Sequence, residues 1–114
     1  MESEARFDES IHAPTRLRLC AMLRPVDFAE FSTLTSTLGI SEANLSKTIR
    51  KLVELGYLST SKHSSPEKND FRRRTNVSLT SQGRRAFDQH LAALQEIATA
   101  ASSSQDPTTP PNDL

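Results

Sequence analysis

The chain has 114 residues and contains few residues of several types, and each shortage excludes a class of protein. A single cysteine, Cys20, can form neither an internal disulfide nor a cysteine-based zinc site. Three glycines exclude a collagen-like chain. No apolar run approaches the roughly 20 residues of a membrane-spanning helix, and the acidic first ten residues lack the apolar stretch of a secretory signal. We therefore expect a soluble, cytoplasmic protein of one domain.

Charge is unevenly distributed along the chain, although the formal net charge is zero. Residues 43–85 carry ten basic and three acidic side chains, whereas residues 1–42 and 86–114 are both net acidic. A local excess of positive charge attracts a polyanion even when the whole molecule is neutral. The middle of the chain is therefore a candidate surface for nucleic acid, and an ordinary solvated basic stretch is the alternative.

Hydrophobic spacing predicts two helices in the first 40 residues. The first covers about 13–23, with Pro14 in its first turn, where the missing N–H costs nothing. A short strand-like bridge at 26–28 precedes the second helix. That helix ends at Leu38, and Gly39 directly after it is suited to cap its C-terminus.

A third helix is predicted after Ser41, which is suited to be its N-cap. Leu45, Ile49 and Leu52 recur at i, i+4 and i+7 and therefore share one face, and Gly56 marks the end. The opposite face carries small, polar and basic residues: Ala43, Asn44, Lys47, Arg50 and Lys51. Together with the second helix and a short linker, this segment forms a helix-turn-helix.

The periodicity changes after Gly56. Residues 57–61 and 75–79 are predicted strands, and the stretch between them contains turn formers and ends in three consecutive arginines. The pattern therefore predicts a basic β-hairpin. Residues 80–83 then open a last helix with apolar residues at heptad-like spacing, namely Phe87, Leu91, Leu94, Ala98 and Ala101.

The predicted fold class is mainly α with a small β-hairpin (α+β), arranged as a winged helix-turn-helix. The folded domain covers 11–101 and includes a C-terminal dimerisation helix. Residues 1–10 are expected to form a flexible N-terminus. Residues 102–114, rich in Ser, Thr and Pro, are expected to form a disordered tail, because they bury too little apolar surface to offset the cost of ordering.

Several segments resemble MarR- and ArsR-type bacterial regulators, over about residues 11–95. The similar segments are 11–19, the block from Ser41 to Leu58 that ends in Leu-Gly-Tyr-Leu, the run 72–75, and the Leu-Thr-x-x-Gly sequence that starts at Leu79. The closest likeness is to small stand-alone winged-helix regulators. The resemblance implies a dimeric, DNA-binding transcriptional regulator with a recognition helix in the major groove and a wing beside the backbone.

The third helix carries the first set of candidate DNA contacts. Asn44 suits an adenine edge, and Lys47 and Arg50 suit guanine or a phosphate. Ser46 and Lys51 are better suited to the DNA backbone, where contacts fix the register rather than the sequence. The alternative is that these side chains are ordinary solvent-facing residues of an amphipathic helix.

The hairpin carries the second set of candidate contacts: Lys62, Arg72, Arg73 and Arg74. Successive strand side chains point to opposite faces, so the three arginines cannot all make the same contact. We expect one or two to meet phosphates or a minor groove, and the third to pair with Glu67 or Asp70. A charged loop that protects a sheet edge is the alternative. In the last helix, Arg84 and Arg85 oppose the helix dipole, which indicates an anionic partner or a nearby acid.

The last helix has more apolar positions than intrachain packing needs. We expect the homodimer interface at Phe87, Leu91, Leu94 and Ile97, with intrachain packing as the alternative. A two-fold dimer predicts an inverted-repeat operator, and the expected function is a repressor that blocks the polymerase. Two alternatives remain, a winged-helix protein–protein adaptor and a sensor that binds a small-molecule effector in a dimer-interface pocket.

The other chemistry-bearing residues give weak signals. Residues 88–90 (Asp-Gln-His) are similar to the start of a metal site in some ArsR-type sensors, but positions i and i+2 do not face each other on a helix. Cys20 is expected to be a small buried hydrophobe, and His12 and His63 show no partner pattern. No phosphate-binding loop, nucleophile elbow or zinc-protease motif is present. The sequence therefore predicts no metal, no cofactor and no enzyme activity.

Overall fold

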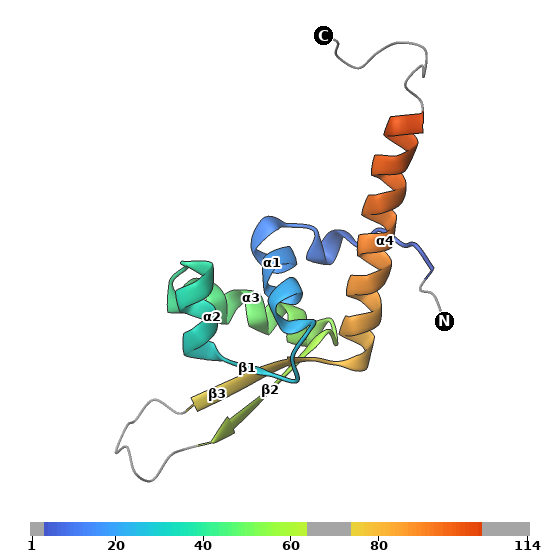
Figure 1. The fold of residues 1–114 in the computed structure, drawn as a ribbon. Coiled ribbons are helices and arrows are strands. Elements are labelled where there is room, and N and C mark those ends of the chain that lie inside the picture. The colour runs from blue at the N-terminus through green and yellow to red at the C-terminus, as the bar shows by residue number, and fades with distance from the viewer. Residues whose placement is uncertain (1–3, 64–73, 104–114) are drawn as a thin grey trace.

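The computed structural model describes residues 4–63 and 74–103. In chain order they form a short 3-10 helix η1 (Glu9–Ile11), α1 (Pro14–Leu23), β1 (Ala29–Glu30), α2 (Phe31–Leu38), α3 (Glu42–Glu54), β2 (Leu58–His63), β3 (Arg74–Leu79) and α4 (Ser81–Ser103). Figure 1 shows α1, α2 and α3 gathered above the small sheet, with α4 beside them. This arrangement confirms the predicted fold class, a winged helix-turn-helix.

The helix ends lie where the sequence signals predicted them. Pro14 occupies the first position of α1. Gly39 follows α2 with a φ of 68°, a left-handed conformation that glycine adopts without steric cost. The hydroxyl of Ser41 accepts the backbone N–H of Asn44 at 3.0 Å and so caps α3. The predicted bridge at 26–28 lies slightly later in the chain, as β1.

The sheet is antiparallel, with strand order β1-β3-β2. Its register places Leu58 opposite Leu79, and Val77 between Thr60 on one side and Ala29 on the other. Leu58, Val77 and Leu79 are buried, so one face of the sheet covers the core. The two residues of β1 pair with β3, and the chain then enters α2 directly at Phe31.

The hydrophobic core lies between the helices and this face of the sheet. Leu45, Ile49 and Leu52 of α3 all lie in it, as their spacing predicted. The buried apolar residues from the other elements are Ile11, Leu19, Cys20, Leu23, Leu34, Leu58, Val77, Leu79, Ala86 and Phe87. One side of α3 is thus fixed against the core, and its other side is left to solvent.

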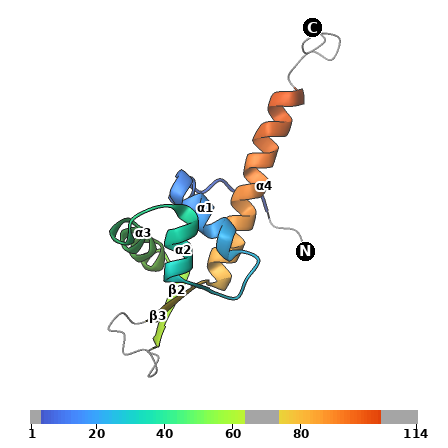
Figure 2. The same ribbon diagram turned by 60° about the vertical axis from the view of Figure 1, so that its left-hand side comes forward.

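The first half of α4 packs against the domain and the second half does not. The buried stripe of α4 contains Phe87, which is only 4% exposed, and also His90 and Ala93. Beyond it, residues 95–102 are exposed. Figures 1 and 2 both show the C-terminal part of α4 standing clear of the other elements. Among the described residues, no helix is both long and apolar enough to cross a membrane.

The N-terminal segment that composition marked as flexible makes defined contacts in its second half. The backbone N–H of Arg6 donates to the carbonyl of Gln89 on α4 at 2.9 Å. The carboxylate of Asp8 caps η1 by accepting the N–H of Ser10. At the other end of the chain, α4 continues to Ser103, and the rest of the expected tail lies outside the described residues.

Candidate nucleic-acid interface

The outward face of α3 carries the predicted set of polar and basic side chains. Asn44, Lys47, Arg50 and Lys51 are exposed, and Ser46 is half-buried. Within the described ranges, the Lys47, Arg50 and Lys51 side chains form no hydrogen bond or ion pair. Their positive charges are therefore not neutralised within this part of the chain and remain available to an anionic partner.

A shallow hollow of about 430 Å³ lies along this face of α3. The residues that line it are Arg16, Asn44, Lys47, Thr48, Arg50, Lys51 and Glu54. Arg16 comes from α1, and its Nη1 donates to the carbonyl of Ser10 at 3.0 Å. Sequence reasoning missed Arg16, because it lies about 30 residues before α3 in a net acidic part of the chain. Only the packing of α1 against the helix-turn-helix brings this guanidinium beside the basic face.

A second hollow, of about 340 Å³, lies between α3 and the sheet. Its lining includes Ser46 and Arg50 from α3 and Lys62 from β2. Lys62 is exposed. Lys62 and the basic face of α3 thus lie on the same side of the molecule, which is the geometry required if both are to meet one DNA duplex.

Arg74 is the first residue of β3, opposite His63 at the end of the strands away from the helices, and its role is partly structural. Its Nη1 lies 3.1 Å from Oε2 of Glu30, so an ion pair links β3 to β1. Sequence reasoning expected an acid from the hairpin loop as the partner of one arginine, and it did not anticipate Glu30. Arg72 and Arg73 lie outside the described residues.

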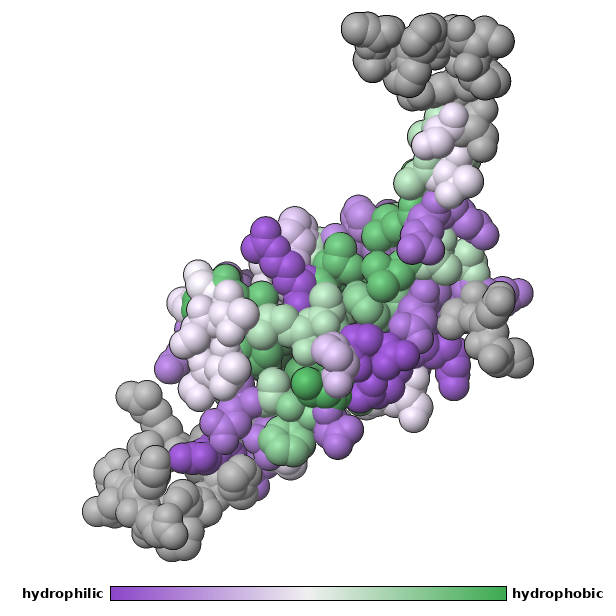
Figure 3. Space-filling model, in the orientation of Figure 1, coloured by the Kyte–Doolittle hydropathy of each residue, from purple (hydrophilic) through white to green (hydrophobic). Residues whose placement is uncertain are grey.

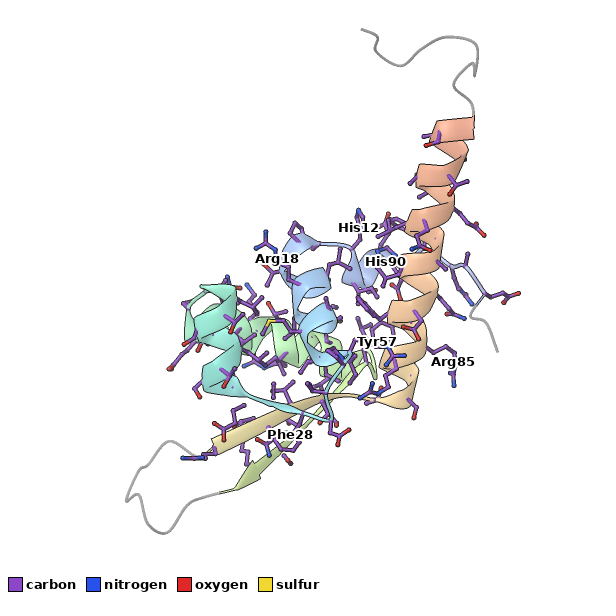
Figure 4. The ribbon with its side chains drawn as sticks, viewed as in Figure 1. His12, Arg18, Phe28, Tyr57, Arg85 and His90 are labelled. Atoms are coloured by element: carbon purple, nitrogen blue, oxygen red, sulfur yellow. The ribbon has the colours of Figure 1, made fainter. Side chains whose placement is uncertain are left out.

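Two charged side chains near the start of α4, Arg84 and Asp88, form hydrogen bonds within the molecule. The two terminal nitrogens of Arg84 donate to the carbonyls of Arg24 and Val26, each at 2.9 Å. Such carbonyls at a helix C-terminus lack intrahelical partners, so Arg84 satisfies the end of α1. Arg24 in turn binds Asp88 through two hydrogen bonds of 2.9 Å. Arg85, in contrast, is exposed and points away from α4 (Figure 4).

The contact between Arg24 and Asp88 shifts the pKa values of both groups. The hydrogen bond from Arg24 holds the pKa of Asp88 below its ordinary value, and the same bond raises the pKa of Arg24. Arg84 therefore pairs with two carbonyls and also lies near a carboxylate, which explains a basic residue in the first turn of α4. The nearby acid that the sequence suggested is Asp88.

Two residues of reactive type also lie in the interior. Cys20 is buried, as predicted, and burial raises the pKa of its thiol to about 12, so the thiol stays protonated and inert. His12, which has no partner pattern in the sequence, lies beside His90 in the structure, with 3.1 Å between Nδ1 of His12 and Nε2 of His90. The two residues are 78 positions apart, so no local signal could have found this pair.

The fold and the exposed basic face define a winged-helix DNA-binding domain, and comparison with known proteins agrees. A family model described as "Winged helix DNA-binding domain" matches residues 15–98. The chain belongs to this family. A curated relative, an uncharacterized protein of Methanocaldococcus jannaschii, is 29% identical over 83 residues, which is 73% of this chain and 86% of the relative.

Solved structures share the fold over most of the chain. A transcriptional regulator homologue from Pyrococcus horikoshii OT3 is 26% identical, with a TM-score of 0.72 over 82% of this chain and 89% of that one. A regulator of the MarR family from Enterococcus faecalis V583 is 20% identical, with a TM-score of 0.66 over 82% and 81%. The predicted winged-helix DNA-binding fold is therefore confirmed, and the MarR-family structure shares it.

Proposed function

We propose that the protein is a transcriptional repressor that acts in the cytoplasm and binds double-stranded operator DNA as a homodimer, without a catalytic step. The observation that carries this proposal is the exposed face of α3, where three cations lack internal partners in the described part of the chain and Arg16 and Lys62 flank them. A helix that presents donors from one face matches the shape and the donor–acceptor pattern of a major groove.

Within this proposal, the side chains of α3 divide into two roles. Asn44, Lys47 and Arg50 contact base edges, because an amide suits adenine and a basic side chain suits guanine. Ser46 and Lys51 contact phosphates and fix the register of the helix. Arg16 adds a phosphate contact from α1, since it lines the same hollow as Lys47 and Arg50.

The hairpin is the wing of the fold, and in this proposal it contacts the DNA backbone. Lys62 lines the same hollow as Ser46 and Arg50 of α3 and would meet the phosphates beside the groove. Arg72 and Arg73 are proposed to contact phosphates or the minor groove, as the sequence predicted. Arg74 has a smaller share in binding, because its guanidinium is already paired with Glu30.

The homodimer is proposed to form through the second half of α4. This helix has 23 residues, and at 1.5 Å per residue it is about 34 Å long, so it extends well past the core. Leu91 and Ile97 are 39% and 57% exposed, and Leu94 is half-buried. Figure 3 shows apolar surface gathered where α4 leaves the domain. Phe87 is left out of the interface, because it packs within its own chain.

Selection of genomic fragments by the purified protein, followed by footprinting, tests the DNA-binding proposal. We expect protection of an inverted repeat with half-sites about one helical turn apart, and an affinity that falls steeply with salt as counterions are released. Binding that does not depend on salt, or no bound fragment, would contradict the proposal. That result would favour a protein–protein adaptor.

A charged side chain introduced on the exposed apolar face of α4 tests the dimer. Ile97→Glu places a carboxylate on the exposed apolar face, so we expect light scattering to report monomers. Thr99→Glu is the matched control, because Thr99 is also exposed but lies about 200° around the helix from Ile97. If Ile97→Glu remains dimeric, the interface lies elsewhere on the molecule.

A small-molecule effector is a second proposal, supported by a cleft of about 520 Å³ between the N-terminal segment and α4. The lining residues are Arg6, Phe7, Asp8, Glu9, Tyr57, Gln82, Arg85, Ala86 and Gln89. The two guanidinium groups and the two aromatic rings of this lining favour a small aromatic carboxylate. Benzoate and its hydroxylated forms should raise the melting temperature of the protein but not that of Arg85→Ala. An equal response of both proteins would contradict this site.

A further inference from the structure

His90 is a buried titratable side chain that the DNA interface does not use. It lies on α4 and is completely buried. The rings of Phe7 and His12 pack against it, with centroid distances of 4.7 Å and 5.1 Å. Figure 4 shows His12 and His90 side by side between η1 and α4. The N-terminal segment, residues 6–12, thus covers an imidazole rather than an aliphatic side chain.

The hydrogen bonds of His90 fix its protonation state. Nδ1 lies 3.0 Å from the backbone N–H of Asp8, which can only donate. Nδ1 must therefore be unprotonated, and the proton of neutral His90 is on Nε2. Nε2 in turn donates to Nδ1 of His12 at 3.1 Å. The chain of bonds runs from Asp8 through His90 to His12, and it requires both imidazoles to be neutral.

We propose that His90 is a proton-sensitive latch that fastens residues 6–12 to α4, and that protonation of His90 releases this segment. A second proton on His90 can go only to Nδ1, where it would face the N–H of Asp8 and break the hydrogen bond. A proton on Nδ1 of His12 would in the same way face the Nε2–H of His90. Because His12 is exposed to solvent, protons can reach the pair without unfolding of the domain.

The latch joins two parts of the molecule. On one side, the N–H of Arg6 donates to the carbonyl of Gln89 on α4. On the other side, the hydroxyl of Tyr57 donates to the carboxylate of Asp8 at 2.5 Å. Tyr57 lies in the turn between α3 and β2, so the segment connects α4 with the end of the helix that carries the basic face. This inference rests on these contacts alone and does not require DNA binding.

Among the groups that surround the latch, His90 is the one whose protonation the proposal invokes. Burial, and next the electrostatic interaction with the His12 imidazole, lower the pKa of His90 below its ordinary value of 6.5, and the nearby carboxylate of Asp8 opposes this shift. The pKa of Cys20 on α1 is about 12, and so is that of Tyr57. Both therefore remain neutral, while the guanidinium groups of Arg6 and Arg16 remain charged throughout this range.

Hydrogen exchange of individual amides, followed by NMR between about pH 7.5 and 5 with EDTA present, tests the latch. The reporter is the amide of Asp8, and the amide of Gly39, bonded to Thr35 on α2, is the internal control. We expect the opening of the Asp8 amide, corrected for intrinsic exchange, to rise about tenfold per pH unit between 6.5 and the lowered pKa of His90. The opening of Gly39 should stay constant.

Two variants complete the test. In His90→Asn, an amide oxygen can still accept the Asp8 N–H but cannot titrate, so the pH dependence at Asp8 should vanish. His63→Asn, at the remaining histidine of the chain and on β2, should keep this pH dependence. The proposal is overturned if His90 titrates in the wild-type protein while protection at Asp8 stays constant. This wild-type comparison decides the question even if His90→Asn does not fold.

Discussion

The two amphipathic helices α3 and α4 both carry several charged residues, but they use their charge in opposite ways. On α3, the Lys47, Arg50 and Lys51 side chains face solvent and have no polar partner in the part of the chain that the structure describes. In the first turns of α4, Arg84 and Asp88 are bound to α1 and to the chain that follows it. A basic residue marks a binding surface only where the fold leaves it unpaired.

The difference follows from the position of each helix. The hydrophobic core contacts α3 on one side, so the other side of α3 is free to face solvent. At the start of α4, Arg84 and Asp88 are half-buried beside α1 and bond to groups within the molecule, because polar groups without partners away from water are costly. Four changes test this comparison, from the largest expected effect to the smallest.

Gly83→Ala should cause the largest loss of stability. A Cβ at this position, near the start of α4, would lie 2.1 Å from the backbone carbonyl oxygen of Tyr57. Alanine favours a helix by about 1 kcal/mol over glycine, yet here we expect a net loss of about 3 kcal/mol from the overpacked contact. Urea unfolding measures the loss.

The matched control for this change is Gly39→Ala. An added Cβ at Gly39 meets nothing within 4 Å, but φ is 68°. The expected loss is therefore only the cost of a left-handed alanine, about 1 kcal/mol. A Gly83→Ala protein as stable as the wild type would show that α4 can move away from the turn at Tyr57.

Arg50→Ala should mainly weaken DNA binding, whereas Arg84→Ala should mainly reduce the stability of the protein. Arg50 has no polar partner among residues 4–63 and 74–103, so its loss should weaken operator binding by about 1–3 kcal/mol and change the stability by less than about 0.5 kcal/mol. Arg84 holds two carbonyls, so its loss should reduce the stability by about 1 kcal/mol and leave binding by the folded protein unchanged. Fluorescence anisotropy with operator DNA and urea unfolding measure the two effects. Equal effects on both properties would remove the distinction between α3 and α4.

Stability should fall as the pH decreases below about 6.5. The pKa of His90 is lowered in the folded state, so the unfolded chain binds the proton first. The contribution of the neutral imidazole is complete above 6.5 and is lost as the pH falls through the lowered pKa, by at most about 1.4 kcal/mol per pH unit. Asp88 acts in a separate window below 3.8, because its own pKa is lowered from that value. Urea unfolding at several pH values should show this slope in the wild type and not in His90→Asn.

Glu30→Gln should have the smallest effect. The change breaks the ion pair with Arg74. Both side chains are more than a third exposed, Glu30 at 35% and Arg74 at 39%. Solvent screens such pairs, so we expect a loss of about 0.5 kcal/mol or less. Freed from this pair, Arg74 should contribute more to DNA binding at low salt. A loss as large as that of Gly83→Ala would mean that β1 depends on this contact.

The order of the elements was predictable because its signals are local. Caps and breakers such as Pro14, Gly39 and Ser41 act within one helical turn, and the i, i+4, i+7 spacing of Leu45, Ile49 and Leu52 specifies which side of α3 is buried. Since burial of one side exposes the other, the basic face of α3 could be named in advance. The exposure of this face is what the structure shows, and its contact with DNA is the proposal built on it.

One error of sequence reasoning concerns the face of α4 to which Phe87 belongs. The heptad spacing grouped Phe87 with Leu91, Leu94 and Ile97 as a dimer interface, but Phe87 lies in the intrachain core, whereas Leu91 and Ile97 are exposed. The buried stripe passes instead through His90 and small alanines, which hydropathy alone does not select. Packing decided this outcome, because Gly83 allows close approach to Tyr57 and thereby sets the rotation of α4.

The amino-acid sequence by itself determined the succession of helices and strands and the side of α3 that faces water, because these depend on interactions between residues a few positions apart. Only the tertiary structure brought Arg16 beside α3, Arg84 to the end of α1, and His12 to His90. Each of these contacts joins residues that are distant along the chain, and its geometry exists only once the core has fixed how the elements pack.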